Sequence, residues 1–72
     1  MIVQPNKKAD YALLWREING VKRFYNHEGR ETVPRKIVNH KTFELAEQEL
    51  QLGQYGGLAL IKDGEPVEFT TV

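Results

Sequence analysis

The chain has 72 residues, no cysteine and a formal net charge of zero, with ten basic and ten acidic side chains. This length corresponds to a single domain, residues 1–72, and leaves no room for a second one. The lack of cysteine excludes disulfides and thiolate metal sites, so the core has to come from hydrophobic residues, 40% of the chain. A domain this small is marginally stable alone, and a homodimer is one way to bury more surface.

The charges are sorted along the chain, although they cancel overall. Residues 1–41 hold nine of the ten basic side chains and four acids, whereas residues 42–72 hold one lysine and six acids. This asymmetry points to an anionic or acidic partner. No apolar run approaches the roughly 20 residues of a membrane span, and no secretory signal is recognisable. The sequence therefore predicts a cytoplasmic protein.

A loose or edge segment is predicted at residues 1–9, because Pro5 removes a backbone donor. After it, residues 10–27 allow two interpretations, a β-hairpin or a helix followed by a strand. The hairpin rests on Asn19-Gly20, a strong signal for a two-residue type I′ turn. That turn sets four pairs of residues opposite each other: Ile18 and Val21, Glu17 and Lys22, Arg16 and Arg23, Trp15 and Phe24.

The helix interpretation rests on apolar residues at i, i+3, i+4 and i+7, the spacing shared by Tyr11, Leu14, Trp15 and Ile18. Asp10 would cap that helix and Gly20 would end it. The choice matters for function, because Arg16 and Arg23 are neighbours only in the hairpin.

Residues 27–30 are typical of a second turn, and residues 32–38 of a short strand that Pro34 confines to an edge or bulge. The clearest helix is predicted over residues 42–52, with Thr42 as its N-cap and a glycine in the left-handed conformation as its stop. Most of its acids lie opposite its apolar side. Glu49 is the exception, and we expect it to extend to solvent or to pair with a basic side chain.

A second hairpin is predicted over residues 58–71, with a type I′ turn at Asp63-Gly64. The turn pairs Lys62 with Glu65, Leu60 with Val67, and Leu58 with Phe69. The predicted order is therefore strand–strand–strand–helix–strand–strand. It gives an α+β domain, a small antiparallel sheet of four to five strands packed on one helix, with its other face partly open. The alternative replaces the first strand by a helix.

The candidate partner-binding residues are arginines and aromatic residues predicted on the sheet and its adjoining turns: Trp15, Arg16, Arg23, Tyr25, Arg30 and Arg35. Two arginines directly opposite each other repel unless they splay apart or share an anion. Guanidinium groups bind carboxylate and phosphate with two parallel hydrogen bonds, and arginine and aromatic residues dominate the energetics of protein interfaces.

Catalytic and metal chemistry have little support in the sequence. The chain contains neither serine nor cysteine, and its two histidines, His27 and His40, fall on predicted turns without a metal-ligand spacing. No glycine-rich segment precedes a helix, as a phosphate-binding loop would require. We therefore expect no catalytic residue, no metal and no cofactor.

These observations predict a small non-enzymatic module, an adaptor or inhibitor that binds a partner protein with an acidic surface. The alternative is a nucleic-acid-binding module that uses the same basic patch, although an isoelectric point near 6.7 argues against it. A third interpretation is a homodimer in which the positive half of one copy meets the negative half of the other.

Overall fold

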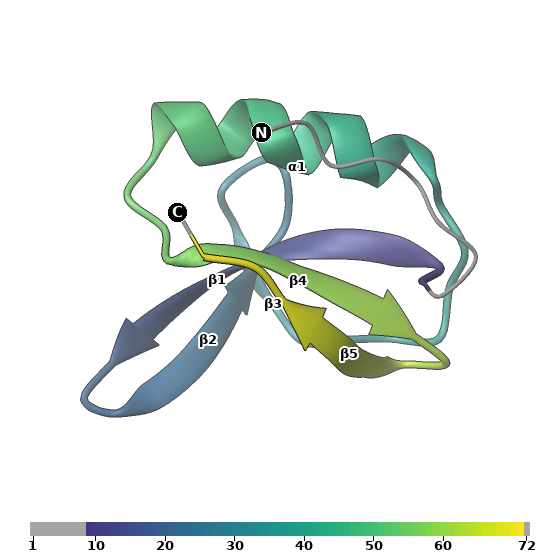
Figure 1. The fold of residues 1–72 in the computed structure, drawn as a ribbon, viewed down its shortest axis with the longest axis horizontal. Helices are drawn as coiled ribbons and strands as arrows, with labels where there is room; N and C mark the ends of the chain where they lie inside the picture. Colours follow the sequence, from purple (N-terminus) through teal and green to yellow (C-terminus); the bar gives the residue numbers. More distant parts are fainter. Residues whose placement is uncertain (1–8, 72) are drawn as a thin grey trace.

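The structure, a computed structural model, describes residues 9–71. It is an α+β domain with a five-stranded antiparallel sheet of order β3-β2-β1-β4-β5 and one helix, as predicted. The elements are β1 (Tyr11–Ile18), β2 (Val21–Tyr25), β3 (Glu31–Thr32), α1 (Lys41–Leu52), β4 (Gly57–Lys62) and β5 (Glu65–Phe69). The helix lies across one face of the sheet (Figure 1). The predicted loose segment falls outside the described residues except for Ala9, which is buried.

The first hairpin is confirmed, and the helix interpretation of residues 10–18 is wrong. Asn19 and Gly20 both have positive φ angles, 54° and 80°, as a type I′ turn requires. The register of β1 and β2 is the predicted one, and Arg16 lies opposite Arg23. Both faces of β1 are buried over residues 11–14, so apolar side chains occupy consecutive positions there and contribute to a spacing that also suits a helix.

The second hairpin has the predicted turn but not the predicted register. Lys62 pairs with Glu65 across a type I′ turn, but a β-bulge then shifts the alignment by one residue. Leu60 lies opposite Glu68 rather than Val67, and the partner of Phe69 is Ala59 rather than Leu58. The cause is Pro66, which has no N–H to donate and is accommodated in sheets at such irregularities. The shift moves Phe69 to the face of the sheet away from the helix.

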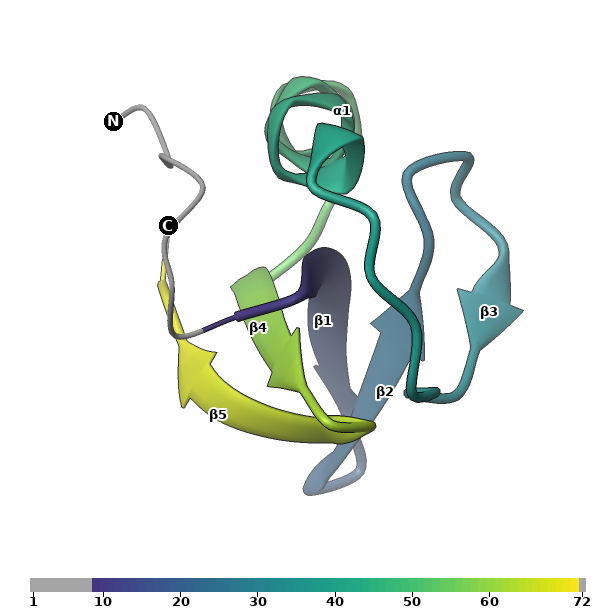
Figure 2. The ribbon, with the colours of Figure 1, turned by 90° about the vertical axis from the view of Figure 1, so that its right-hand side faces the viewer.

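The predicted third strand is present as β3, but its predicted bounds, residues 32–38, are wrong, because β3 ends at Thr32. Residues 33–38 instead form an irregular segment that leads past the start of β1 to the helix (Figure 2). The Tyr11 hydroxyl fixes this segment by donating to the Arg35 carbonyl at 2.9 Å and accepting from the Arg35 N–H at 2.7 Å. Pro34 has no N–H to donate to a neighbouring strand. The two hydrogen bonds between the Tyr11 hydroxyl and the Arg35 backbone hold the segment instead of strand pairing.

The start of the helix differs from the prediction in its cap. The helix begins at Lys41, so His40 occupies the N-cap position and makes no side-chain capping bond. Thr42 lies inside the first turn, where its hydroxyl donates to the Asn39 carbonyl and accepts from the buried Ala12 N–H, both at 2.8 Å. The helix ends before Gly53, which is extended rather than left-handed, with φ of −112°.

Two clusters of buried side chains hold the sheet, one on each face. The helix-side cluster consists of Ala9, Ala12, Leu14, Tyr25, Phe43, Ala46, Leu58 and Leu60. The second cluster consists of Tyr11, Leu13, Ala59 and Ile61, with Trp15 and Phe24 packed against it. Within residues 9–71 no helix has the length and apolar character needed to cross a membrane.

Candidate functional site

The hairpin of β1 and β2 carries the two opposed arginines on its helix-side face, because side chains alternate along a strand and Ala12 and Leu14 pack under the helix. The turn of this hairpin extends past the helix and away from the rest of the sheet (Figure 1). Beyond the arginines the same face presents Ile18 and Val21, whose exposed fractions are 39% and 57%.

Arg16 is held between two tyrosine rings. Its guanidinium carbon lies 4.8 Å from the ring centroid of Tyr25 and 4.9 Å from that of Tyr55. Its Nε donates to the Gln54 carbonyl at 2.9 Å. No acidic side chain among residues 9–71 forms an ion pair with Arg16. The guanidinium is therefore ordered by the protein, while the charge has no intramolecular counterion in the described structure.

Tyr55, which the sequence did not single out, is itself fixed by the helix. Its hydroxyl donates to Oε2 of Glu49 at 2.8 Å, and its ring lies 5.9 Å from that of Tyr25. Burial, followed by the hydrogen bond and charge of Glu49, raises the pKa of Tyr55 above its ordinary value. Glu49 thus accepts from a phenol, where we had expected it to reach solvent or a basic side chain.

Arg23 is paired within the chain. Its Nη1 donates to Oε2 of Glu31 at 2.9 Å, and the two side chains are 50% and 52% exposed. The hydrogen bond and then the charge of Glu31 raise the pKa of Arg23 above its ordinary value. Glu31 on β3 is the anion that relieves the repulsion between the opposed arginines. It also makes Arg23 less available than Arg16 to an external carboxylate.

Trp15 lies on the opposite face from the arginines. There it forms an aromatic cluster with Phe24 and Phe69, in which the Phe69 centroid lies 6.1 Å from that of Trp15 and 6.2 Å from that of Phe24. The Lys22 ammonium lies 5.1 Å from the Trp15 centroid. The indole also donates to the Thr70 carbonyl at 2.9 Å. These contacts explain how a tryptophan on the sheet is ordered although it is only partly buried.

The other two predicted arginines are placed differently. Arg30 is in the turn after β2, where its N–H donates to the Asn26 side chain at 3.0 Å. This turn lies beside Tyr55, since a Cβ atom on the preceding residue, Gly29, would be 3.5 Å from the Tyr55 hydroxyl. Arg35 contacts Tyr11, five residues before Arg16 on β1, which separates the two positions by roughly 17 Å. The structure therefore brings together Arg16, Arg23 and Tyr25, adds Tyr55, and separates this group from Trp15 and Arg35. We call these four residues the arginine face.

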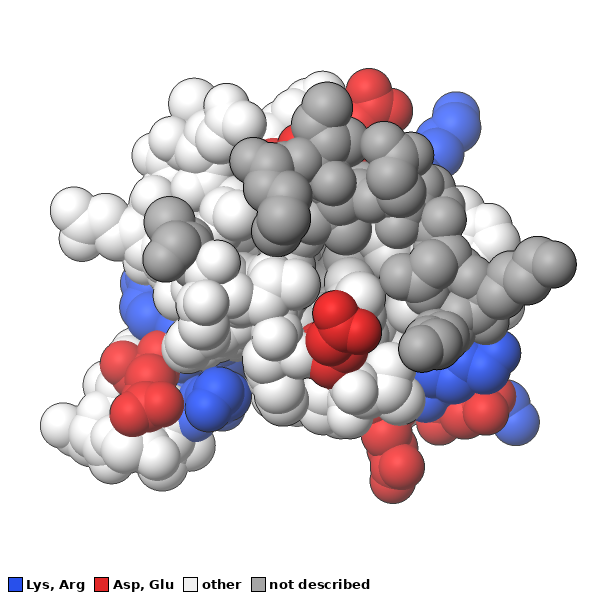
Figure 3. Space-filling model, viewed as in Figure 1, with Lys and Arg blue, Asp and Glu red and all other residues white. Residues whose placement is uncertain are grey.

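The segregation of charge along the chain is only partly translated into space. The basic half supplies β3, β2 and β1 and the acidic half supplies β4 and β5, so the halves lie side by side in the sheet. However, Lys22 pairs with Glu17 within the basic half, and Lys62 pairs with Asp10 across the two halves. Figure 3 shows acidic and basic side chains next to one another on the face it displays.

In the described part of the chain, no three His, Cys, Asp or Glu side chains lie close enough together to bind one metal ion. The chain matches no family model, and comparisons with curated proteins and with solved structures found no match.

Proposed function

We propose that this protein is a non-enzymatic interaction module that binds an acidic segment of a partner protein through the arginine face. The observation that carries the proposal is the position of Arg16 between Tyr25 and Tyr55, with its Nε bonded to Gln54. A side chain ordered before binding loses little conformational entropy when it meets its ligand.

The remaining donors of Arg16 suit a carboxylate. Because Nε is used by Gln54, the two terminal nitrogens are the groups left to form parallel hydrogen bonds with both oxygens of one carboxylate. Ile18 and Val21, exposed on the same face, supply apolar contact area beside the charge. A cluster of arginine and tyrosine bordered by apolar side chains has the composition of an interface hot spot.

The test is a pull-down from the native host with the double variant Arg16→Ala/Arg23→Ala and with the unchanged protein, quantified by mass spectrometry. We expect acidic proteins captured by the unchanged protein to fall by roughly tenfold or more with the double variant. The control is Lys62→Ala, which removes a charge on β4 and should retain the same proteins. If the double variant keeps its fold by circular dichroism and captures the same proteins equally, the arginine face is not the binding site.

A nucleic-acid-binding module is the second candidate, and the rings beside Arg16 favour it because bases stack on aromatic side chains. It differs from the first candidate in its dependence on salt. Binding to a polyanion weakens linearly in log–log form, with a slope close to the number of phosphates contacted. A mobility-shift titration with single- and double-stranded oligonucleotides at low salt tests it. Absence of a shift at micromolar protein would exclude this candidate.

A further inference from the structure

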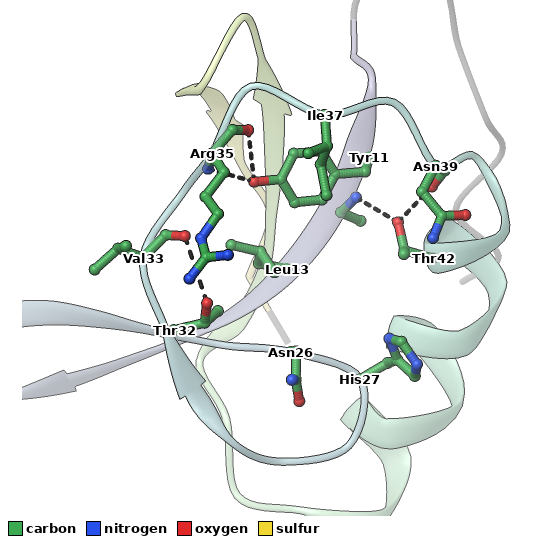
Figure 4. A pocket seen from close by; sticks show the side chains of 11 residues that line it. Tyr11, Leu13, Asn26, His27, Thr32, Val33, Arg35, Ile37, Asn39 and Thr42 are labelled. Atoms are coloured by element: carbon green, nitrogen blue, oxygen red, sulfur yellow. Dashed lines mark hydrogen bonds between the residues drawn. The ribbon is translucent and has the colours of Figure 1, made fainter.

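A pocket of about 360 Å³ lies between the start of β1, the start of α1 and the loop of residues 26–39 (Figure 4). It arises because β1 is longer than its partner. Tyr25, the last residue of β2, pairs with Leu14, so Tyr11–Leu13 have β4 on one side and no strand on the other. The loop takes that place without forming a ladder, and the space between them stays open.

The loop that closes the pocket is held in shape at both ends. At its start, Oδ1 of Asn26 accepts from the N–H groups of Glu28 and Arg30 at 2.8 and 3.0 Å. Towards its end, both bonds between Tyr11 and the Arg35 backbone fix the segment against β1. The pocket is therefore formed by a tethered loop and does not require a rearrangement to exist.

The polar side of the pocket is cationic. The guanidinium of Arg35 extends across it towards Thr32 and Leu13 (Figure 4). Asn26 and His27 border the pocket from the loop after β2, although the Asn26 amide oxygen is bonded within its own turn. Within residues 9–71 no acidic side chain pairs with Arg35. Glu31, the residue before Thr32 on β3, is bound to Arg23.

The apolar part of the lining consists of Leu13, Ile37 and the ring of Tyr11, and Thr32, Asn39 and Thr42 add polar groups. Val33 borders the pocket, but its side chain points away from it and is 66% exposed. A pocket with one charged donor beside apolar side chains suits a ligand that has one anionic group and an apolar body. Its volume is at the lower end of the roughly 300–1,000 Å³ typical of small-molecule sites. We propose that this pocket binds a small organic carboxylate, with the carboxylate on Arg35 and the apolar body against Leu13.

The proposal is independent of the arginine face, because Arg16 lies at the opposite end of β1. It also gives Arg35, predicted from the sequence as a partner contact, a separate role. His27 was expected to be a residue of an exposed turn; it is partly buried and lines the pocket beside Asn26.

The test is a ¹H–¹⁵N NMR titration of the full chain with benzoate, and with benzamide as the uncharged probe of the same shape. We expect benzoate to shift the amide signals of Leu13, His27 and Ile37 with a millimolar dissociation constant. Benzamide should bind roughly tenfold more weakly, because it cannot form a charge-assisted pair with the guanidinium.

One variant of Arg35 and two controls assign the effect to its side chain. Arg35→Gln removes the charge, keeps a shorter polar side chain and leaves the backbone bonds to Tyr11 in place, and we expect it to weaken benzoate binding by roughly tenfold. Lys36→Ala, which removes a neighbouring charge that does not line the pocket, is the matched control and should bind within about twofold of the unchanged protein. In Arg16→Ala/Arg23→Ala, benzoate should still shift the amide signals of Leu13, His27 and Ile37 as in the unchanged protein, because neither arginine lines the pocket. Equal binding of both probes, unchanged affinity in Arg35→Gln, or no shifts with about 10 mM benzoate would each overturn the proposal.

Discussion

Single residues connect the layers of this domain, and Thr42 is the clearest case. Its hydroxyl is both donor and acceptor, so one side chain links the first turn of the helix to the backbone of β1. Ala12, whose N–H it satisfies, is 1% exposed, and no water can replace the lost partner without entering the core.

We expect Thr42→Val to lower the free energy of unfolding by about 1–3 kcal/mol, because it keeps the shape and leaves the Ala12 N–H buried without a partner. Urea unfolding followed by circular dichroism measures the loss. Thr32→Val is the control, since the Thr32 hydroxyl makes only a long bond of 3.5 Å to its neighbour's carbonyl. Equal losses in the two variants would show that the link between Thr42 and β1 is not stabilising.

Tyr55 makes stability depend on pH in the alkaline range. Its pKa is raised in the folded protein by burial and by Glu49. The unfolded chain therefore loses the proton first, and this contribution is complete below about pH 10 and declines as the pH rises above it. Tyr55→Phe lacks the ionising hydroxyl while keeping the ring, and the other tyrosines titrate in both proteins.

We therefore expect the stability advantage of the unchanged protein over Tyr55→Phe to stay constant from about pH 8 to about pH 9 and to shrink as the pH rises to about 11. Urea unfolding of both proteins at each pH measures it. An advantage that stays constant over this range would show that the Tyr55 hydroxyl has the same proton affinity in the folded and unfolded chains.

Among the elements, the turns could be predicted from the sequence and the irregular strands could not. Asn19-Gly20 and Asp63-Gly64 set the pairing next to each turn correctly, because type I′ geometry depends only on local residues. The bulge opposite Ile61 depends on how Pro66 is fitted against a neighbouring strand. The strand predicted over residues 32–38 fails after Thr32, because the group that holds the following segment is the hydroxyl of Tyr11. Tyr11 is distant in sequence, so local residues do not reveal this contact.

The same distinction applies to the arginine face. The opposition of Arg16 and Arg23 follows from the turn and was predicted. Tyr55 is distant from Arg16 in sequence and lies between glycines in a loop, where no periodicity indicates the direction of its side chain. Glu31 reaches Arg23 only because β3 is added at the edge of the sheet. Contacts between distant residues require the fold before they can be deduced.

The start of β4 packs closely against the end of β5. A Cβ atom on Gly57 would lie 1.9 Å from the Thr70 carbonyl oxygen, and two hydrogen bonds join Leu58 to Thr70. Backbone crowds this position, so the site cannot adjust by rotating a side chain.

We expect Gly57→Ala to cost more than roughly 3 kcal/mol, at or beyond the upper end of ordinary overpacking. Gly20→Ala is the control, because nothing lies within 4 Å of the added atom and only the left-handed backbone is penalised, by about 1–2 kcal/mol. Thermal unfolding compares them. Similar melting temperatures for the two variants would contradict the close approach of β4 and residue 70.

At the scale of the whole molecule, the central strand β1 carries both hydrophobic clusters. Its residues alternate between the helix-side cluster, with Leu14 fully buried, and the cluster on the other face, with Leu13. A domain of this size has a stability of only a few kcal/mol. The loss of one large side chain from β1 is therefore comparable to the whole free energy of unfolding.

We expect Leu14→Ala to cost about 2–5 kcal/mol and to leave much of the protein unfolded at room temperature. Leu52→Ala is the matched control, because Leu52 is 83% exposed at the end of the helix and should change stability by less than about 0.5 kcal/mol. Near-ultraviolet circular dichroism and urea unfolding measure both. A cooperative, unchanged transition in Leu14→Ala would mean that the core tolerates the cavity.

The central position of β1 also constrains how the chain folds as it is made. A ribosome releases β1 and β2 early, but the second neighbour of β1 arrives only with residues 57–61, because Trp15 pairs with Gly57 and Tyr11 with Ile61. At 5–20 residues per second this interval lasts roughly 2–7 s. During it, a nascent hairpin exposes an unpaired edge and two apolar surfaces, which is the period in which a chaperone or premature aggregation competes with folding.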